Sequence, residues 1–70
     1  MKILITGSNG LLGSNLVRFF LAENDYDVFA TSYHPSCFSD IENFVKGDFL
    51  DVNFADKLLS MTKPDIIIIQ

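Results

Sequence analysis

The sequence predicts an α/β protein built on a parallel, doubly wound sheet. Short apolar runs alternate with helix-like patterns in the order β-α-β-β-α-β along the 70 residues. Short connections between these segments favour parallel pairing through right-handed crossovers. The last run, 65–70, holds four consecutive isoleucines without polar alternation, as in a strand that is covered on both faces. The expected strand order is 3-2-1-4, which is the first half of a doubly wound sheet.

The first half of the chain contains two expected strands joined by a helix. Residues 2–6 are nearly all apolar and predict the first strand, and residues 27–32 predict the second. Between them, apolar residues at i, i+4, i+7 and i+8 predict an amphipathic helix that begins near Leu12. This stripe consists of Leu12, Leu16, Phe19 and Phe20. Asn24 is the expected left-handed residue at the end of this helix.

The second half contains two further strands and one helix. Residues 44–47 and 65–70 predict the strands, and a short helical turn is expected at 39–43. Asp51 or Asn53 is suited to cap the helix between the strands. The helix has apolar positions at Phe54, Leu58 and Met61. Pro64 should end it, because the residue before a proline avoids helical backbone angles.

Composition limits the classes of function. The chain is 49% hydrophobic and 20% charged, as is typical of globular proteins. Its net charge of -4 and its lack of a basic amphipathic stretch argue against binding to nucleic acid or to a membrane surface. The single cysteine, Cys37, has no cysteine partner and no metal-site pattern, so we interpret it as a structural thiol. Without a secretory signal or a membrane-spanning stretch, the expected location is the cytoplasm.

A glycine-rich run, TGSNGLLG, joins the first strand to the first helix and is the most specific motif of the chain. Gly7 allows the tight turn, Gly10 a close approach of the main chain to a pyrophosphate, and Gly13 close packing of the helix. The amides around Gly10, Leu11 and Leu12 lie at the helix N-terminus, where the macrodipole favours phosphate. The loop has no basic residue, and no Gly-Lys-Ser/Thr sequence of a P-loop follows it. The motif therefore predicts dinucleotide binding, with a purely structural turn as the alternative.

The Thr-Gly-x-x-Gly-x-x-Gly spacing resembles that of the extended short-chain dehydrogenase/reductase family, whose members are NAD(P)-dependent epimerases, dehydratases and reductases of nucleotide sugars. The GDFLD segment at 47–51 is similar to the family's Gly-Asp-x-x-Asp segment, and Lys63-Pro64-Asp65 is similar to the start of its fourth strand. Within the family, the chain is most similar to the dTDP-4-dehydrorhamnose reductase, or sugar-nucleotide-binding, branch. The resemblance covers all 70 residues and implies a Rossmann fold. Residues 1–70 would be the N-terminal part of its NAD(P)-binding domain, with the catalytic and substrate-binding parts outside the chain.

The resemblance also implies which residues bind the cofactor. Asp48 and Phe49 would contact the adenine, with the Asp48 carboxylate accepting from the exocyclic amine. Their position agrees with this role, because ligands of open α/β sheets bind at the carboxyl ends of the strands. The alternative for Asp48 is a helix-capping or loop acid. The residues that would line the pyrophosphate are Gly7, Gly10, Leu11, Leu12 and Gly13.

Ser32 bears on the choice between NAD and NADP. It occupies the position where the family's ribose-binding acid is expected, and such an acid would repel a 2′-phosphate. Thr31, Ser32 and His34 offer donors to a phosphate, although the arginine or lysine that usually accompanies one is missing. NADP(H) is therefore favoured over NAD(H). His34 has an alternative role as a solvated loop residue.

The chain has no candidate catalytic residue. The family transfers hydride with a Tyr-x-x-x-Lys pair, and neither Tyr26 nor Tyr33 has a lysine four residues later. We expect the cofactor-binding segment of a nucleotide-sugar oxidoreductase, in which the full-length protein transfers hydride from NADPH to a 4-keto sugar. The alternatives are a non-catalytic dinucleotide-binding or interaction module and a truncated product without activity. The isolated chain should be marginally stable, bind cofactor weakly, and have an exposed last strand as a surface for self-association.

Overall fold

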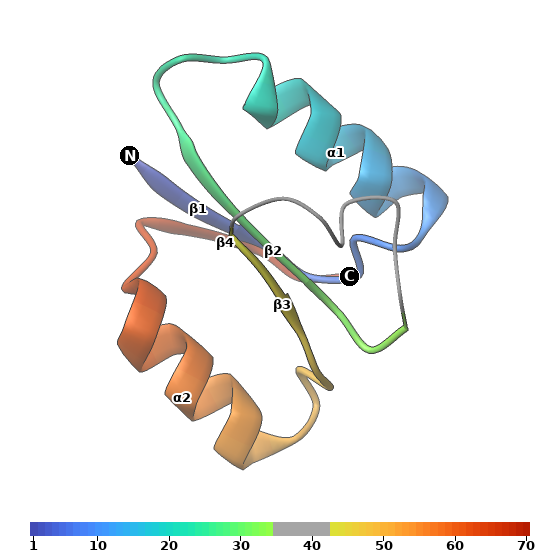
Figure 1. Cartoon of the computed structure of the whole chain (residues 1–70), viewed down its shortest axis with the longest axis vertical. Helices are drawn as coiled ribbons and strands as arrows, with labels where there is room; N and C mark the ends of the chain where they lie inside the picture. Colours follow the sequence, from blue (N-terminus) through green and yellow to red (C-terminus); the bar gives the residue numbers. More distant parts are fainter. Residues whose placement is uncertain (35–42) are drawn as a thin grey trace.

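The computed structural model describes residues 1–34 and 43–70. A four-stranded parallel sheet has the order β3-β2-β1-β4, with α1 on one face and α2 on the other (Figure 1). The predicted α/β class and the strand order 3-2-1-4 are confirmed. Cys37 and, except for Asn43, the expected turn at 39–43 lie outside the described residues. The elements are β1 (Lys2–Ile5), α1 (Leu11–Leu21), β2 (Asp27–Ser32), β3 (Phe44–Lys46), α2 (Val52–Thr62) and β4 (Ile66–Ile68).

The register brings the carboxyl ends of all four strands to one edge of the sheet. Ile5 at the end of β1 pairs with Ala30 of β2 and with Ile68 of β4. On the side of β2 away from β1, Ser32 pairs with Lys46 of β3. The segments that follow the strands therefore lie close together, and this edge carries the candidate site.

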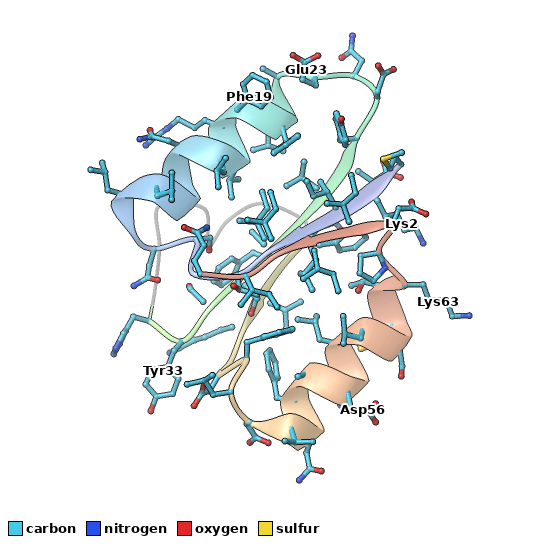
Figure 2. The ribbon with its side chains drawn as sticks, turned by 180° about the vertical axis from the view of Figure 1, so that it is seen from behind. Lys2, Phe19, Glu23, Tyr33, Asp56 and Lys63 are labelled. Carbon is cyan, nitrogen blue, oxygen red and sulfur yellow. The ribbon has the colours of Figure 1, made fainter. Side chains whose placement is uncertain are left out.

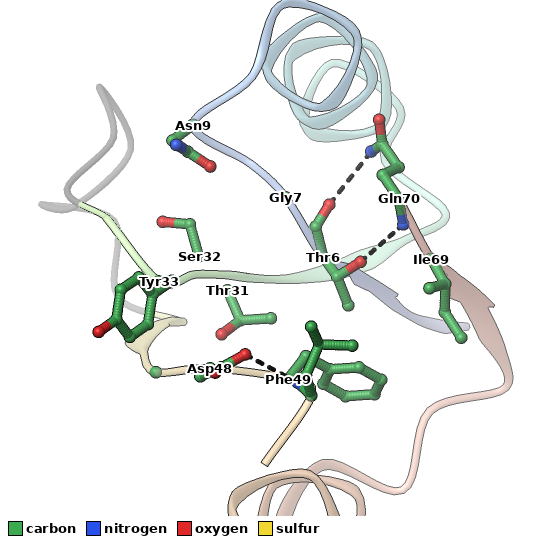
Figure 3. Close-up of a pocket in the computed structure, with 12 residues that line it drawn as sticks. Thr6, Gly7, Asn9, Thr31, Ser32, Tyr33, Asp48, Phe49, Ile69 and Gln70 are labelled. Carbon is green, nitrogen blue, oxygen red and sulfur yellow. Dashed lines mark hydrogen bonds between the residues drawn. The ribbon is translucent and has the colours of Figure 1, made fainter.

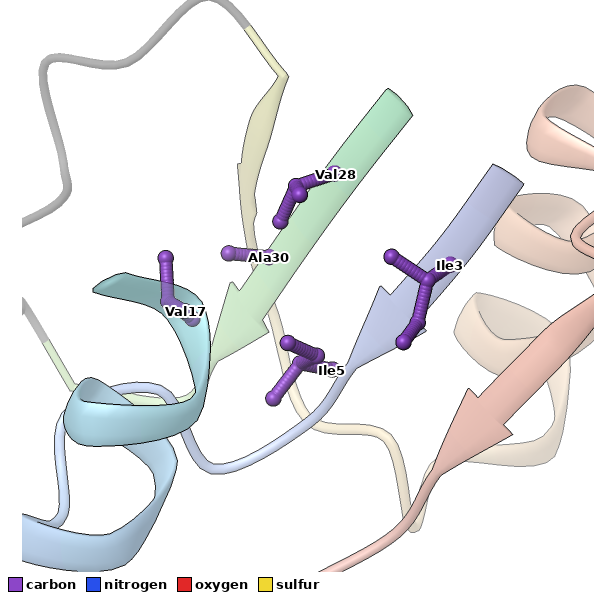
Figure 4. Close-up of a cluster of buried hydrophobic side chains, with 5 residues drawn as sticks. All are labelled: Ile3, Ile5, Val17, Val28 and Ala30. Atoms are coloured by element: carbon purple, nitrogen blue, oxygen red, sulfur yellow. The ribbon is translucent and has the colours of Figure 1, made fainter. Parts of the chain in front are cut away.

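The core lies between α1 and the sheet (Figure 4). Its strand residues alternate along β1 and β2 and therefore project towards α1, which contributes the remaining member. The buried cluster consists of Ile3, Ile5, Val17, Val28 and Ala30. On α2, Leu58 is likewise buried. Burial on both faces of β1, whose Leu4 is also inaccessible, explains its nearly uniform apolar sequence.

The predicted apolar stripe of α1 is partly wrong. Leu12 and Phe19 are 63% and 58% exposed, and Phe19 lies on the outer side of the helix (Figure 2). Gly13 and Val17 are the buried residues, because the helix approaches the sheet most closely along that line. The predicted positions Leu16 and Phe20 do pack against the core.

The predicted left-handed end of α1 is also wrong. The helix ends at Leu21, and Ala22 caps it in a right-handed conformation, with its amide hydrogen-bonded to the Arg18 carbonyl at 3.2 Å. Asn24 lies in the turn that follows and does not have a positive φ. This turn leads into β2 through Tyr26, whose ring packs edge-to-face on Phe20 with 4.8 Å between centroids.

Local signals at both ends of α2 are confirmed. Of the two predicted caps, Asp51 is the one used, because its Oδ1 accepts from the Asn53 amide at 2.9 Å. The helix ends at Thr62, before Pro64, and Lys63 closes it with a φ of 47°. Of the apolar positions named for this helix, Leu58 is buried and Met61 is exposed. Thr62 is buried instead.

The fourth strand is shorter than predicted and forms an edge of the sheet. It pairs with β1, and the expected exposure of this last strand is confirmed for Ile66, Ile67 and Ile69. Self-association through it remains a prediction. The two helices of residues 1–34 and 43–70 have 11 residues each, and neither is long and apolar enough to cross a membrane.

Candidate functional site

Two positions of the glycine loop after β1 require glycine, one for its backbone conformation and one for lack of space. Gly7 has a φ of 63°, in the left-handed region that other residues rarely adopt. At Gly13, a Cβ would lie 2.1 Å from the Gly7 carbonyl oxygen, which is far inside van der Waals contact. At Gly10, a Cβ would meet the same oxygen at an ordinary 3.5 Å. The fold itself therefore requires Gly7 and Gly13, whereas a Cβ at Gly10 would make only an ordinary van der Waals contact.

The N-terminus of α1 offers backbone donors. Its first hydrogen bond runs from the Ser14 amide to the Gly10 carbonyl at 2.9 Å, so the amides of Leu11, Leu12 and Gly13 precede the helical ladder. The Gly10 amide, which was expected to be a phosphate donor, instead donates to the Gly7 carbonyl at 3.1 Å. The donors at this helix end are therefore those of residues 11–13, and the macrodipole adds positive potential there.

A pocket of about 210 Å³ opens at the carboxyl edge of the sheet (Figure 3). The segments after all four strands contribute to it. Its lining residues are Thr6, Gly7, Asn9, Thr31, Ser32, Tyr33, Gly47, Asp48, Phe49, Leu50, Ile69 and Gln70. The structure thus brings together four of the predicted cofactor residues, namely Gly7, Ser32, Asp48 and Phe49. The other four are outside the lining, at the start of α1, and they are Gly10, Leu11, Leu12 and Gly13.

Asp48 has a structural role and is also open to a ligand. Its Oδ1 accepts from the Leu50 amide at 2.9 Å, and its carbonyl accepts from the Asp51 amide at 2.9 Å, which shapes the turn after β3. The loop-acid alternative is therefore realised by one carboxylate oxygen. Among residues 1–34 and 43–70, the second oxygen, Oδ2, has no hydrogen-bond partner. Asp48 can thus accept from a ligand without giving up its turn.

The side chain of the last residue of β2 bonds to the main chain two residues later. Ser32 is buried, and its Oγ donates to the His34 carbonyl oxygen. Thr31 is also buried, and its Oγ1 has no partner in the described part of the chain. Tyr33 and His34 are exposed, with their rings edge-to-face and 4.9 Å between centroids. Of the three predicted phosphate donors, Thr31 and Ser32 line the pocket and His34 does not.

The residue after β4 contributes to the site although the sequence did not single it out. Gln70 lines the pocket, and its main-chain amide donates to Thr6 Oγ1 at 2.9 Å. Its side-chain Nε2 donates to the Thr6 carbonyl oxygen at 3.1 Å (Figure 3). The available signal was a polar residue directly after four isoleucines, at the strand end where ligands bind.

The described residues offer no alternative chemistry of comparable kind. No group of three His, Cys, Asp or Glu side chains within 1–34 and 43–70 is placed to hold a metal ion. Tyr33 is the tyrosine that lines the pocket, and Tyr26 packs on Phe20 instead. The arrangement is suited to binding an anionic, partly planar ligand along the strand ends.

Comparisons with known proteins agree with this geometry. A family model described as "NAD dependent epimerase/dehydratase family" matches residues 3–70. The chain is similar to dTDP-glucose 4,6-dehydratase from Bacillus anthracis str. Ames, solved in complex with NAD, with a TM-score of 0.80, 25% identity, and coverage of 99% of this chain and 26% of that one. L-Threonine 3-dehydrogenase from Trypanosoma brucei gives a TM-score of 0.81 with 23% identity, over 96% of this chain and 22% of that one, and bears on the fold alone. The chain thus spans about a quarter of the length of these structures, and the search of curated proteins gave no match.

Proposed function

Because the chain belongs to the NAD dependent epimerase/dehydratase family, we propose that it binds the adenine and pyrophosphate half of a nicotinamide dinucleotide. The observation that carries this proposal is the uncapped N-terminus of α1 beside a pocket whose far side holds Asp48. A ligand that fits such a site is elongated, with an anionic group at one end and a base at the other. The neighbouring dehydratase was solved with NAD, which supports this class of cofactor.

The two ends of the site would act by different chemistry. The amides of Leu11, Leu12 and Gly13 would donate to the pyrophosphate oxygens, without any basic side chain in the loop. Asp48 Oδ2 would accept from the exocyclic amine of adenine, and Phe49 would contact the base. Hydride transfer is the chemistry that the nicotinamide supplies when bound, and the residues of this chain would bind and orient the other half of the cofactor.

The ribose site leads us to propose NADP(H) as the preferred cofactor. Ser32 lies in the pocket at the end of β2 and is neutral, so it would not repel a 2′-phosphate as an acid would. Its hydroxyl proton is directed to the His34 carbonyl, so a phosphate contact would require its rotation. The preference for NADP(H) would therefore come from the absence of a carboxylate at position 32.

The whole-protein activity that we propose is reduction of a 4-keto nucleotide sugar, as in the dTDP-4-dehydrorhamnose reductase branch. The resemblance of the sequence to that branch supports this proposal, and the similarity of segments 47–51 and 63–65 to those of the family supports the wider assignment. In this proposal, residues 1–70 form the N-terminal part of the NAD(P)-binding domain. The catalytic pair and the sugar site would lie elsewhere in the full-length protein.

Calorimetric titration of the intact protein with NADPH, NADH and ADP-ribose tests the cofactor proposal. We expect all three to bind and NADPH to bind more tightly than NADH. Absence of binding by every one of them would contradict dinucleotide binding, and tighter binding of NADH would contradict the NADP preference alone.

A second candidate function, an interaction module, is favoured by the exposed edge of β4. Ile66, Ile67 and Ile69 are exposed there, and unpaired strand edges are surfaces for pairing with another chain. Light scattering of the protein and of Ile67→Lys tests it. A dimer that Ile67→Lys converts to a monomer would support this function, and a monomer at all concentrations would overturn it.

A further inference from the structure

Gln70 connects the end of β4 to the glycine loop through two hydrogen bonds. Its main-chain amide donates to Thr6 Oγ1 at 2.9 Å, and its carboxamide Nε2 donates to the Thr6 carbonyl at 3.1 Å. Thr6 directly precedes Gly7, and its own amide donates to the Ile68 carbonyl at 3.0 Å. Thr6 Oγ1 also donates to the Ile68 carbonyl at 3.4 Å. Four hydrogen bonds therefore join Thr6 to residues 68 and 70, and Gln70 donates two of them.

The Gln70 side chain also lies against the two glycines that shape the loop. A Cβ built on Gly7 would be 3.3 Å from the Gln70 Cβ, and one built on Gly13 would be 3.0 Å from Nε2. Figure 3 shows the side chain extending from β4 towards the start of α1. Gln70 thus touches both the turn and the helix that supplies the backbone donors.

A glycine loop needs such an external restraint. Gly7 has a φ of 63°, but glycine also adopts many other conformations at little cost, so its own preference does not fix the turn. Backbone donors bind an anion well only when they are held in the binding orientation beforehand. The hydrogen bond from the carboxamide to Thr6 fixes the residue that precedes this permissive position.

We propose that Gln70 is a positioning residue for the pyrophosphate of the dinucleotide. By donating to the Thr6 carbonyl, it holds the turn so that the amides of Leu11 and Leu12 point at the ligand. This inference rests on the proposed function, since it names what orients the donors of that site. It concerns the donor group of the carboxamide, because an apolar side chain of equal length would fill the same space without the bond.

The test compares Gln70→Met, which keeps the length of the side chain and removes the donor, with Gln70→Glu, which also adds an anion near the phosphates. Ile67→Val, in β4 and outside the pocket lining, is the matched control. The probes are ADP-ribose, which contains the pyrophosphate, and adenosine, which does not. Affinities are measured in the intact protein by calorimetry and ligand-observed NMR.

We expect Gln70→Met to bind ADP-ribose about fivefold more weakly, as for the loss of one neutral hydrogen bond, and Gln70→Glu to bind it more weakly still. Adenosine affinity should stay within about twofold, because the contacts proposed for its base are at Asp48 and Phe49. Unchanged ADP-ribose affinity in Gln70→Met would overturn the inference. Equal losses for both probes would also overturn it, since they would indicate general damage to the fold.

Two further outcomes distinguish failure of the positioning role from failure of the proposed function. If the unsubstituted protein binds adenosine and ADP-ribose but Gln70→Met changes neither, the proposed function stands and the positioning role fails. If the unsubstituted protein binds neither probe, the proposed function fails and the positioning role fails with it. Should Gln70→Met not fold, Gln70→Ser removes the same donor and carries the same comparison of probes.

Discussion

The two ends of the pocket are built on different principles. At the glycine loop, backbone geometry determines the residue type: Gly7 has a positive φ, and Gly13 has no room for a Cβ. At the ends of β2 and β3, side chains form the site: Ser32 and Asp48 each hydrogen-bond to a neighbouring backbone group and still line the pocket. Substitutions at the loop should therefore damage fold and binding together. Those at the strand ends should change which ligand is preferred.

Gly13→Ala should have the largest effect, because its Cβ would lie 2.1 Å from the Gly7 carbonyl oxygen. Either the helix or the turn must move, and we expect a loss of about 3 kcal/mol in the free energy of unfolding together with loss of dinucleotide binding. Urea denaturation followed by circular dichroism measures the first quantity. Gly10→Ala is the matched control, since its Cβ meets that oxygen at 3.5 Å and should leave stability nearly unchanged. Similar destabilisation by both would break the distinction within the loop.

Ser32→Asp should have the next largest effect, on cofactor preference. A carboxylate at the end of β2 would repel a 2′-phosphate and bind ribose hydroxyls, so the ratio of NADPH to NADH affinity should fall about thirtyfold. The two dissociation constants are measured by titration of the intact protein. Ser32→Ala serves as control, because it removes the hydroxyl without adding charge. An unchanged ratio in Ser32→Asp would show that the ribose lies elsewhere.

Asp48→Asn sharpens the assignment of the adenine end. An amide oxygen can keep the bond to the Leu50 amide, while a donor replaces Oδ2. We expect about tenfold weaker binding of ADP-ribose and a relative gain for the hypoxanthine analogue, which presents a carbonyl in place of the amine. Both affinities come from competition titrations. If the substitution weakens the adenine and hypoxanthine ligands equally, Asp48 does not contact the base.

Asp51→Ala should have the smallest effect and should be confined to stability. It removes the cap of α2, whose Oδ1 accepts from the amides of Asn53 and Phe54 at 2.9 and 3.4 Å. The expected cost is about 1 kcal/mol in unfolding free energy. Dinucleotide affinity should not change, since Asp51 lies outside the pocket lining. Asp56→Ala, an exposed position of the same helix, is the control, and a binding defect in Asp51→Ala alone would contradict this separation.

What the sequence predicted follows the same division. The glycine loop and the α2 cap were predictable because each depends on local backbone requirements that limit the residue type. The strand order was predictable because short connections favour right-handed parallel crossovers. The buried face of α1 was partly mispredicted because counting apolar residues overlooks Gly13, which is buried for its lack of a side chain. The hydrogen bond from Gln70 to Thr6 joins residues 64 positions apart, and only their positions in the folded sheet reveal it.

A crystal structure of the intact protein with NADPH bound would show directly whether the dinucleotide lies at the carboxyl edge of the sheet. We expect pyrophosphate oxygens within hydrogen-bond distance of the Leu11 and Leu12 amides, and the adenine amine within that distance of Asp48. A dinucleotide bound away from the carboxyl edge of the sheet, or one whose phosphates are held by side chains instead of these amides, would contradict this expectation.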